Sequence, residues 1–222
     1  MKAAKLILAL TFIVVTTGTA SEIKLPASGK WFVMQGGDTI NVNHHMRLRA
    51  QWYGIDLMEV DGVGGRSLNK GSGKKKEDFY SWDQPIISPT EGEVIQVFDG
   101  LPDNDLGTKD RQNPAGNYVV IKTEHDTYIF IGHLKKESVV VKTGDILAIG
   151  DALGRCGNSG NSDFPHIHIH MQDTPVLNEG TGINMTFTGL DIELSGKSFK
   201  DVDWPLLQGL FISNHGGLNQ SR

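Results

Sequence analysis

The chain has 222 residues, including 27 glycines and the single cysteine Cys156, and its formal net charge is −5. A single cysteine excludes both an internal disulfide framework and a zinc site built from several thiolates. The acidic balance argues against a nucleic-acid partner, which would require a basic face.

The first twenty residues have the layout of a secretory signal peptide. Lys2 and Lys5 flank the start of the chain, the apolar run LILALTFIVV follows, and small residues lead to Ala20. The run is too short for a bilayer, which requires about 20 residues, so we expect no integral membrane span. We therefore expect export to the periplasm, cell envelope or extracellular space, with 1–20 as signal peptide and 21–222 as a single domain.

Short segments rich in β-branched and aromatic residues, separated by Gly, Asn or Asp, predict strands along the chain. They are residues 31–35, 51–58, 84–98, 117–123, 127–134, 138–142, 145–149 and 165–172. This pattern predicts an all-β protein, mainly an antiparallel β-sandwich or open barrel, with long loops and little helix. Residues 59–83 and 99–116 are expected to be long loops, and residues 197–213 to contain a short helix interrupted near Pro205.

Three histidines fall at alternate positions of the segment PHIHIHM. Alternate side chains of a strand share a face, so His166, His168 and His170 are expected to project together, with Ile167 and Ile169 on the apolar side. A row of imidazoles repels itself when charged and forfeits packing area, so it contributes little to a fold. The pattern therefore favours metal binding or proton transfer over an exposed polar sheet face.

The segment GRCGNSGNSDF leads directly into these histidines. Its glycines, together with Asn158 and Ser159, predict a turn-forming loop of the kind that brings backbone amides close to a bound molecule. We expect Asn158 and Ser159 to line a cleft beside the histidine row. His44 is a further cleft-lining candidate, and His170 either lines the same cleft or hydrogen-bonds the next strand.

The run GNSGNSDFPHIHIHM closely resembles the signature of the lysostaphin-like zinc metallopeptidases, in which a Gly-Asn-Ser-Gly loop precedes a His-x-His strand. Upstream, YIFIGHL with VVVKTGDILAIG, then QPIISPTEGEVIQV, then NHHMRLRAQWYGIDL resemble three further motifs of that family in the right order. The resemblance covers about residues 31–190, leaving 191–222 as a C-terminal extension. It implies a β-sheet fold, one Zn²⁺ per chain and hydrolysis of peptide bonds, commonly in bacterial peptidoglycan.

The resemblance also assigns individual residues. His168, the second histidine of the His-x-His pair, matches a zinc ligand, and Asp56 in YGIDL matches the carboxylate ligand. His166 and His133 match the two catalytic histidines of the family.

The first histidine ligand departs from the commonest form of the family, which places it four positions before the aspartate, where this chain has Trp52. A branch of the family carries Asn-x-His farther upstream, and Asn43-His44-His45 satisfies that pattern. Because adjacent residues of a strand point to opposite faces, we expect one of the two histidines to reach the metal, and favour His45 over His44.

Two imidazoles and one carboxylate leave zinc a fourth position for water, as in catalytic sites. Zinc lowers the pKa of such a water to about 7 and polarises a carbonyl, while His133 and His166 would accept the proton and stabilise the oxyanion. We therefore expect an exported zinc-dependent endopeptidase acting on peptidoglycan or another peptide substrate. The alternative is a non-catalytic family member that binds and activates a separate cell-wall hydrolase, although such relatives characteristically lack some of the ligands.

Overall fold

The computed structural model describes residues 22–61 and 66–217, so the expected signal peptide lies outside the described residues. The strands are β1 (Trp31–Gln35), β2 (Ile55–Glu59), β3 (Pro85–Ile87), β4 (Gly92–Phe98), β5 (Asn117–Lys122), β6 (Tyr128–Leu134), β7 (Ile146–Leu147), β8 (Ala152–Arg155), β9 (Ile167–Gln172), β10 (Gly182–Ile183), β11 (Phe187–Leu194), β12 (Lys197–Trp204) and β13 (Phe211–Asn214).

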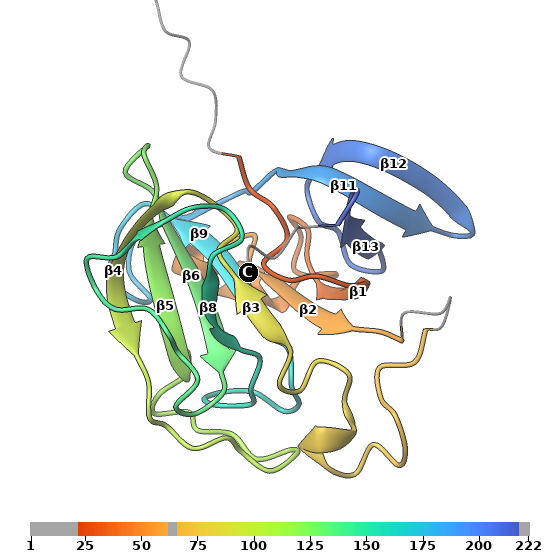
Figure 1. The fold of residues 1–222 in the computed structure, drawn as a ribbon, viewed down its shortest axis with the longest axis horizontal. Helices are drawn as coiled ribbons and strands as arrows, with labels where there is room; N and C mark the ends of the chain where they lie inside the picture. The colour runs from red at the N-terminus through yellow and green to blue at the C-terminus, as the bar shows by residue number, and fades with distance from the viewer. Residues whose placement is uncertain (1–21, 62–65, 218–222) are drawn as a thin grey trace, which may run out of the picture.

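One large sheet has the order β12-β11-β13-β1-β2-β9-β6-β5-β4-β7, with β10 also on β9, and β3 pairs with β8 in a second sheet. Figure 1 shows β4, β5 and β6 at one side of the molecule and β11, β12 and β13 at the other. All of these strand pairs are antiparallel. The predicted all-β fold is therefore confirmed.

Helical backbone within the described residues is limited to three short 3-10 turns. These are η1 (His44–Arg47), η2 (Arg49–Gln51) and η3 (Lys76–Asp78). No helix in the described part of the chain has the length and apolar character to cross a membrane.

The main core lies between the large sheet and the β3–β8 pair. Ile121 on β5, Ile131 on β6 and Ile169 on β9 are buried there against Ile86 on β3 and Leu153 on β8. Burying a side chain of this size contributes about 1.5–3 kcal/mol to stability. On the opposite face, β9 carries His168 and His170, while β5 and β6 carry a smaller apolar cluster of Tyr118, Val120 and Phe130.

The C-terminal segment differs from the expectation of a helix near Pro205. Leu194 pairs with Lys197 across a two-residue turn, and both turn residues, Ser195 and Gly196, have positive φ (49° and 79°). Such turns match the twist of antiparallel strands, so the chain folds back as the β11–β12 hairpin. Strand β13 then inserts between β11 and β1, and the tail extends the large sheet.

Two smaller differences concern the middle of the chain. Residues 138–142, expected as a strand, form no regular strand, although Val140 donates its N–H to the Leu153 carbonyl at 3.0 Å. The strand that pairs with β3 to form the second sheet is β8, which the sequence pattern did not predict.

Candidate metal centre

Three histidines converge on one carboxylate oxygen near the middle of the large sheet. Asp56 on β2 pairs in register with His168 on β9. Its Oδ1 atom lies 3.0 Å from His168 Nδ1, 3.1 Å from His45 Nε2 and 3.5 Å from His166 Nε2. All four residues are buried, and they line a cleft of about 410 Å³.

His45 is held by a clamp formed by Asn43. The side-chain oxygen of Asn43 accepts the His45 N–H at 3.1 Å, and its amide nitrogen donates to the carbonyls of Gly37 and Gly54 at 2.8 and 3.0 Å. Gly54 immediately precedes β2, so the clamp ties turn η1 to the strand that carries Asp56. The asparagine of the Asn-x-His pattern thus fixes the position of the histidine two residues later.

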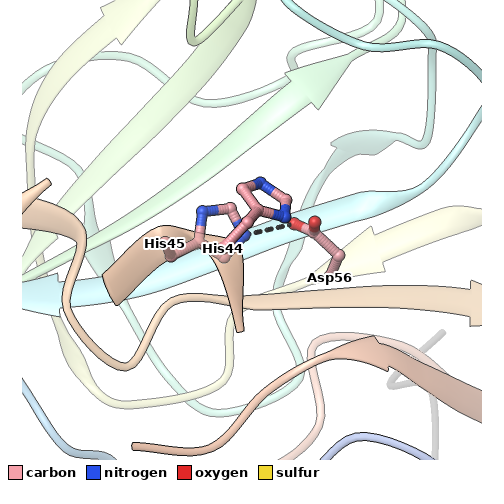
Figure 2. Close-up of side chains that lie close together, drawn as sticks. All are labelled: His44, His45 and Asp56. Atoms are coloured by element: carbon pink, nitrogen blue, oxygen red, sulfur yellow. Dashed lines mark ion pairs between the residues drawn. The ribbon is translucent and has the colours of Figure 1, made fainter. Parts of the chain in front are cut away.

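His44 and His45 lie in turn η1 rather than on the strand that we expected. Their rings therefore do not point to opposite faces: the ring centroids are 4.1 Å apart, and both residues line the cleft. One ligand atom from each lies within 4.8 Å of the others in the group with Asp56 (Figure 2). His45 is buried and His44 is exposed at the rim, so His45 remains the better candidate ligand.

Trp52 supports the same turn from the position where the commonest form of the motif has histidine. Its indole Nε1 donates to the Met46 carbonyl at 3.0 Å. Gly182 on β10 packs so closely that a Cβ there would overlap the Trp52 main chain. Trp52 therefore has a packing role beneath η1.

The predicted shared face of β9 is confirmed. His166, just before the strand, and His168 and His170 within it all line the cleft, while Ile167 and Ile169 lie in the core. Strand alternation thus brings the whole row to the face that carries Asp56.

His133 reaches the same cleft through a local inversion of β6. Ile131 and Leu134 both lie in the core, and regular alternation would place His133 on the core side with Ile131. Its φ of 60° is left-handed, which is uncommon for a residue other than glycine. The ring consequently enters the cleft, with its centroid 4.7 Å from that of His166. Such local strain is characteristic of functional sites.

Backbone carbonyls hold the same ring nitrogen in both of these histidines. His133 Nδ1 lies 2.8 Å from the Ser159 carbonyl oxygen, and His166 Nδ1 lies 2.9 Å from that of Phe164. A carbonyl oxygen only accepts, so Nδ1 carries a hydrogen in each ring and donates it. The nitrogen that gains or loses a proton is therefore Nε2 in both.

Burial and neighbouring charges together set the charge states of these groups. Desolvation lowers the pKa of His133 well below its ordinary value and that of His168 to about 3. Burial alone would raise the pKa of Asp56, but the facing histidines, His45 foremost, hold it well below its usual range. For His166 burial acts to lower the pKa, but the Asp56 carboxylate outweighs it and raises the pKa. An anionic Asp56 and a neutral His168 are the states that metal ligation requires.

The glycine-rich loop before β9 contributes to the cleft indirectly, through the residues that it positions. Asn158 and Ser159 are 0% exposed and are not among the residues that line the cleft. Ser159 Oγ donates to the Leu134 carbonyl at 2.7 Å, and Asn158 N–H donates to Asp103 Oδ1 at 2.7 Å. Ser159 also supplies the carbonyl that orients His133. The loop acts on the cleft by positioning that histidine.

Gln172 extends the histidine row of β9, although no motif in the sequence pointed to it. Along β9, His168 Nε2 lies 2.9 Å from His170 Nδ1, and His170 Nε2 lies 3.2 Å from Gln172 Oε1. The ring of His170 stacks on Phe130 with centroids 4.8 Å apart and an interplanar angle of 8°. The signal in the sequence is the continued alternation, since Gln172 follows His170 by two positions.

The donor set fits a divalent metal such as zinc. His45 Nε2 is buried without a hydrogen-bond partner although it lies 3.1 Å from Asp56 Oδ1. Zinc holds nitrogen and oxygen ligands at about 2.0–2.2 Å in a tetrahedron, which places ligand atoms about 3.3 Å apart. The separations of 3.1 and 3.0 Å from Asp56 Oδ1 to His45 and His168 are close to that value.

Part of the chain matches a known peptidase family. Residues 78–184 match the family profile described as Peptidase family M23. A curated relative, an uncharacterized metalloprotease of Buchnera aphidicola subsp. Baizongia pistaciae, is 39% identical over 57 residues, 26% of this chain and 15% of that protein. The chain therefore spans only a small part of that relative's length.

Solved structures also resemble the chain in part. A zinc containing peptidase from Vibrio cholerae matches with 17% identity over 73% of this chain and 39% of its own, at a TM-score of 0.41. The catalytic domain of lysostaphin from Staphylococcus simulans matches with 16% identity over 70% of this chain and 87% of its own, also at 0.41. The profile match spans His133, His166 and His168, and it identifies residues 78–184 as a domain of Peptidase family M23.

Proposed function

We propose that the protein is an exported zinc-dependent endopeptidase that hydrolyses peptide bonds in the stem or cross-link peptides of peptidoglycan. The observation that carries the proposal is that His45 Nε2 and His168 Nδ1 both approach the buried Asp56 Oδ1, at 3.1 and 3.0 Å. Membership of a peptidase family supports the peptide bond as the bond that is cut. The signal-peptide layout of residues 1–20 supports export.

His45, Asp56 and His168 would hold the metal. Zinc, when bound, supplies a Lewis acid that polarises a carbonyl and lowers the pKa of water to about 7. Three protein ligands are the number that catalytic zinc sites use. The cleft of about 410 Å³ is of a size that accommodates a short peptide segment.

His133 and His166 would handle the proton and the developing charge. Both rings have Nδ1 fixed by a backbone carbonyl, so each presents Nε2 for proton transfer. Between them they would accept the proton of the attacking water, stabilise the oxyanion and return a proton to the leaving amine. Because these carbonyls lie on the fixed loop before β9, neither ring needs to reorient during the reaction.

Metal analysis combined with digestion of isolated cell walls tests the proposal. We expect about one zinc per chain in the purified protein and release of new peptide amino termini from the walls. Both should disappear in His168→Ala. A protein without zinc, or a His168→Ala variant that digests walls normally, contradicts the proposal. A protein that is inactive alone but stimulates a separate hydrolase would instead support the non-catalytic alternative.

A further inference from the structure

Gln172 sets the direction of a hydrogen-bond chain that runs along β9. Its side-chain nitrogen donates to the carbonyls of Thr174 and Val176 at 2.6 and 2.8 Å. Carbonyl oxygens only accept, so the amide must present its nitrogen to them and its oxygen to His170. Gln172 is 0% exposed, so bulk water offers no alternative partner.

This orientation determines the hydrogen positions on the two histidines that follow. Gln172 Oε1 accepts, so His170 Nε2 must carry a hydrogen, at a separation of 3.2 Å. His170 is 1% exposed and its two nitrogens face only His168 and Gln172, so no carboxylate balances a buried charge on its ring. A neutral imidazole has one N–H, so His170 Nδ1 bears a lone pair. His168 Nε2, 2.9 Å away, must then donate to it. The remaining nitrogen of His168, Nδ1, is left with a lone pair.

That lone pair faces the Asp56 carboxylate oxygen at 3.0 Å. Two acceptors at such a distance repel each other unless a cation lies between them. Charge-assisted hydrogen bonds are roughly twice as strong as neutral ones, so the carboxylate by itself favours a hydrogen on Nδ1. A hydrogen at that position would block the atom that the metal needs.

We propose that His170 and Gln172 are positioning residues that hold His168 in the Nε2–H tautomer and thereby reserve Nδ1 for the metal. The proposal rests on the proposed zinc centre. Second partners of metal-bound histidines generally fix the tautomer and orientation of the ring. Here the partner is itself a histidine, whose own tautomer is dictated by a glutamine.

Phe130 keeps the relay aligned. Its ring stacks on His170 at a centroid distance of 4.8 Å and an angle of 8°, and both residues are buried. The stacking resists rotation of the imidazole out of the chain of hydrogen bonds. It also makes His170→Phe a suitable variant, since an aromatic ring can retain the packing while both nitrogens are removed.

The first test measures tautomers in the metal-free full chain. Long-range ¹H–¹⁵N correlation spectra distinguish protonated ring nitrogens from those with a lone pair. We expect Nε2–H for both His168 and His170 in the unaltered protein, and a shift of His168 towards Nδ1–H in His170→Phe. Predominant Nδ1–H at His168 in the unaltered protein, or an unchanged His168 in the variant, overturns the proposal. Neither result depends on peptidase activity, so a failure of the proposed function is recognised separately.

The second test measures zinc affinity by competition with a chelator. Loss of such a second partner typically weakens metal binding by about 10–100-fold, and we expect this for His170→Phe. His170→Gln supplies an oxygen that can accept from His168 and should recover most of the affinity. His125→Phe, in the turn between β5 and β6, is the control and should bind as the unaltered protein does.

Two outcomes of the affinity measurement overturn the proposal. One is equal affinity of His170→Phe and the unaltered protein. The other is an equal loss in His170→Phe and His170→Gln, which would indicate packing rather than hydrogen-bond acceptance. Should His170→Phe fail to fold, Gln172→Met removes the anchor alone. It should then produce a mixture of His168 tautomers, and a single Nε2–H tautomer would contradict the proposal.

Discussion

The central strand β9 and the edge strand β12 show opposite relations between polarity and burial. All six residues of β9 are buried although three of them are His168, His170 and Gln172. Seven of the eight residues of β12 are exposed although they include Phe199 and Trp204, each 48% exposed. Strand β9 lies between β2 and β6, whereas β12 is at the end of the sheet order.

The contrast shows which part of the fold depends on a specific set of hydrogen bonds. A buried polar group without a partner costs about 1–3 kcal/mol, so the cleft face of β9 is stable only with its hydrogen bonds in place. An exposed aromatic at a sheet edge has no such requirement. Substitutions should therefore be costly at the centre and tolerated at the edge.

Removing His168, the proposed metal ligand on β9, should produce the largest effect. His168→Ala takes away the nitrogen that faces Asp56 at 3.0 Å. Since zinc would supply the electrophile, activity should fall below about 1% of the original and the zinc content should drop with it. Metal analysis and wall digestion measure both. Retention of full zinc content would mean that β9 is not the metal-binding strand.

Removing His166, a proposed proton-transfer group, should produce the next largest effect. His166→Ala should keep zinc but lose roughly 10²–10⁴-fold in rate, as expected for a general acid or base. The measurement is the turnover rate of variant protein whose zinc content has been verified. If zinc is lost instead, His166 serves the metal centre rather than proton transfer.

Removing the clamp should affect stability as well as binding. Asn43→Ala leaves the His45 N–H and the carbonyls of Gly37 and Gly54 without that partner, which should cost about 1–3 kcal/mol. Denaturant unfolding of the metal-free protein measures the loss. Lys200→Ala on β12, which removes an exposed ion pair with Asp191, is the control and should change stability by less than about 1 kcal/mol. Equal losses of stability in the two variants would contradict the contrast between the buried centre and the exposed edge of the sheet.

The pH dependence of stability should reveal Glu59 at the end of β2. Burial raises the pKa of Glu59 from 4.5 to about 7, and its Oε2 atom is buried without a hydrogen-bond partner. The folded state therefore holds this proton more tightly than the unfolded chain. The resulting stabilisation is complete below pH of about 4.5 and is lost as the pH rises through about 7.

Glu59→Gln should remove that loss. At pH 8 we expect the variant to be more stable than the unaltered protein by about 1 kcal/mol, a figure reduced because the side chain is partly exposed to solvent. Thermal unfolding between pH 4 and pH 8 gives the comparison. Parallel curves for the two proteins over this range would show that Glu59 has an ordinary pKa.

The smallest effect should come from the edge. Trp204→Ala on β12 removes a ring that is 48% exposed, so stability should change by about 0.5 kcal/mol or less. Zinc content and activity should be unaffected. A large loss of activity would show that the β11–β12 hairpin takes part in substrate binding.

Local patterns explain what could be predicted of the fold. The alternation in the β5, β6 and β9 segments is visible in the sequence, and these strands lie close to their predicted bounds. The β11–β12 hairpin was missed because its signal is the Ser195-Gly196 pair, a turn that is recognised only when the flanking strands are already suspected.

Five of the residues singled out in the sequence lie together in the structure, but the geometry that brings them together could not be predicted. His45, Asp56, His133, His166 and His168 all line one cleft. The turn at His45 depends on contacts that Asn43 makes with Gly37 and Gly54, and the inversion at His133 depends on a φ of 60°. Neither the Asn43 contacts nor the His133 backbone angle produces a periodic pattern in the sequence.

The Asn43 clamp has a consequence for how this centre tolerates change in chain length. The Asn43 side chain bonds both the His45 N–H and the Gly54 carbonyl, so it links the two ends of the segment between residues 43 and 54. These contacts, rather than the number of residues in the segment, set the position of the His45 ring. Insertions or deletions within residues 47–51 should leave His45 beside Asp56, provided that the Asn43 contacts with Gly37 and Gly54 and the Trp52 contact with Met46 are kept. A proposed ligand held in this way can change its spacing from the aspartate in the sequence and still occupy the same position in the site.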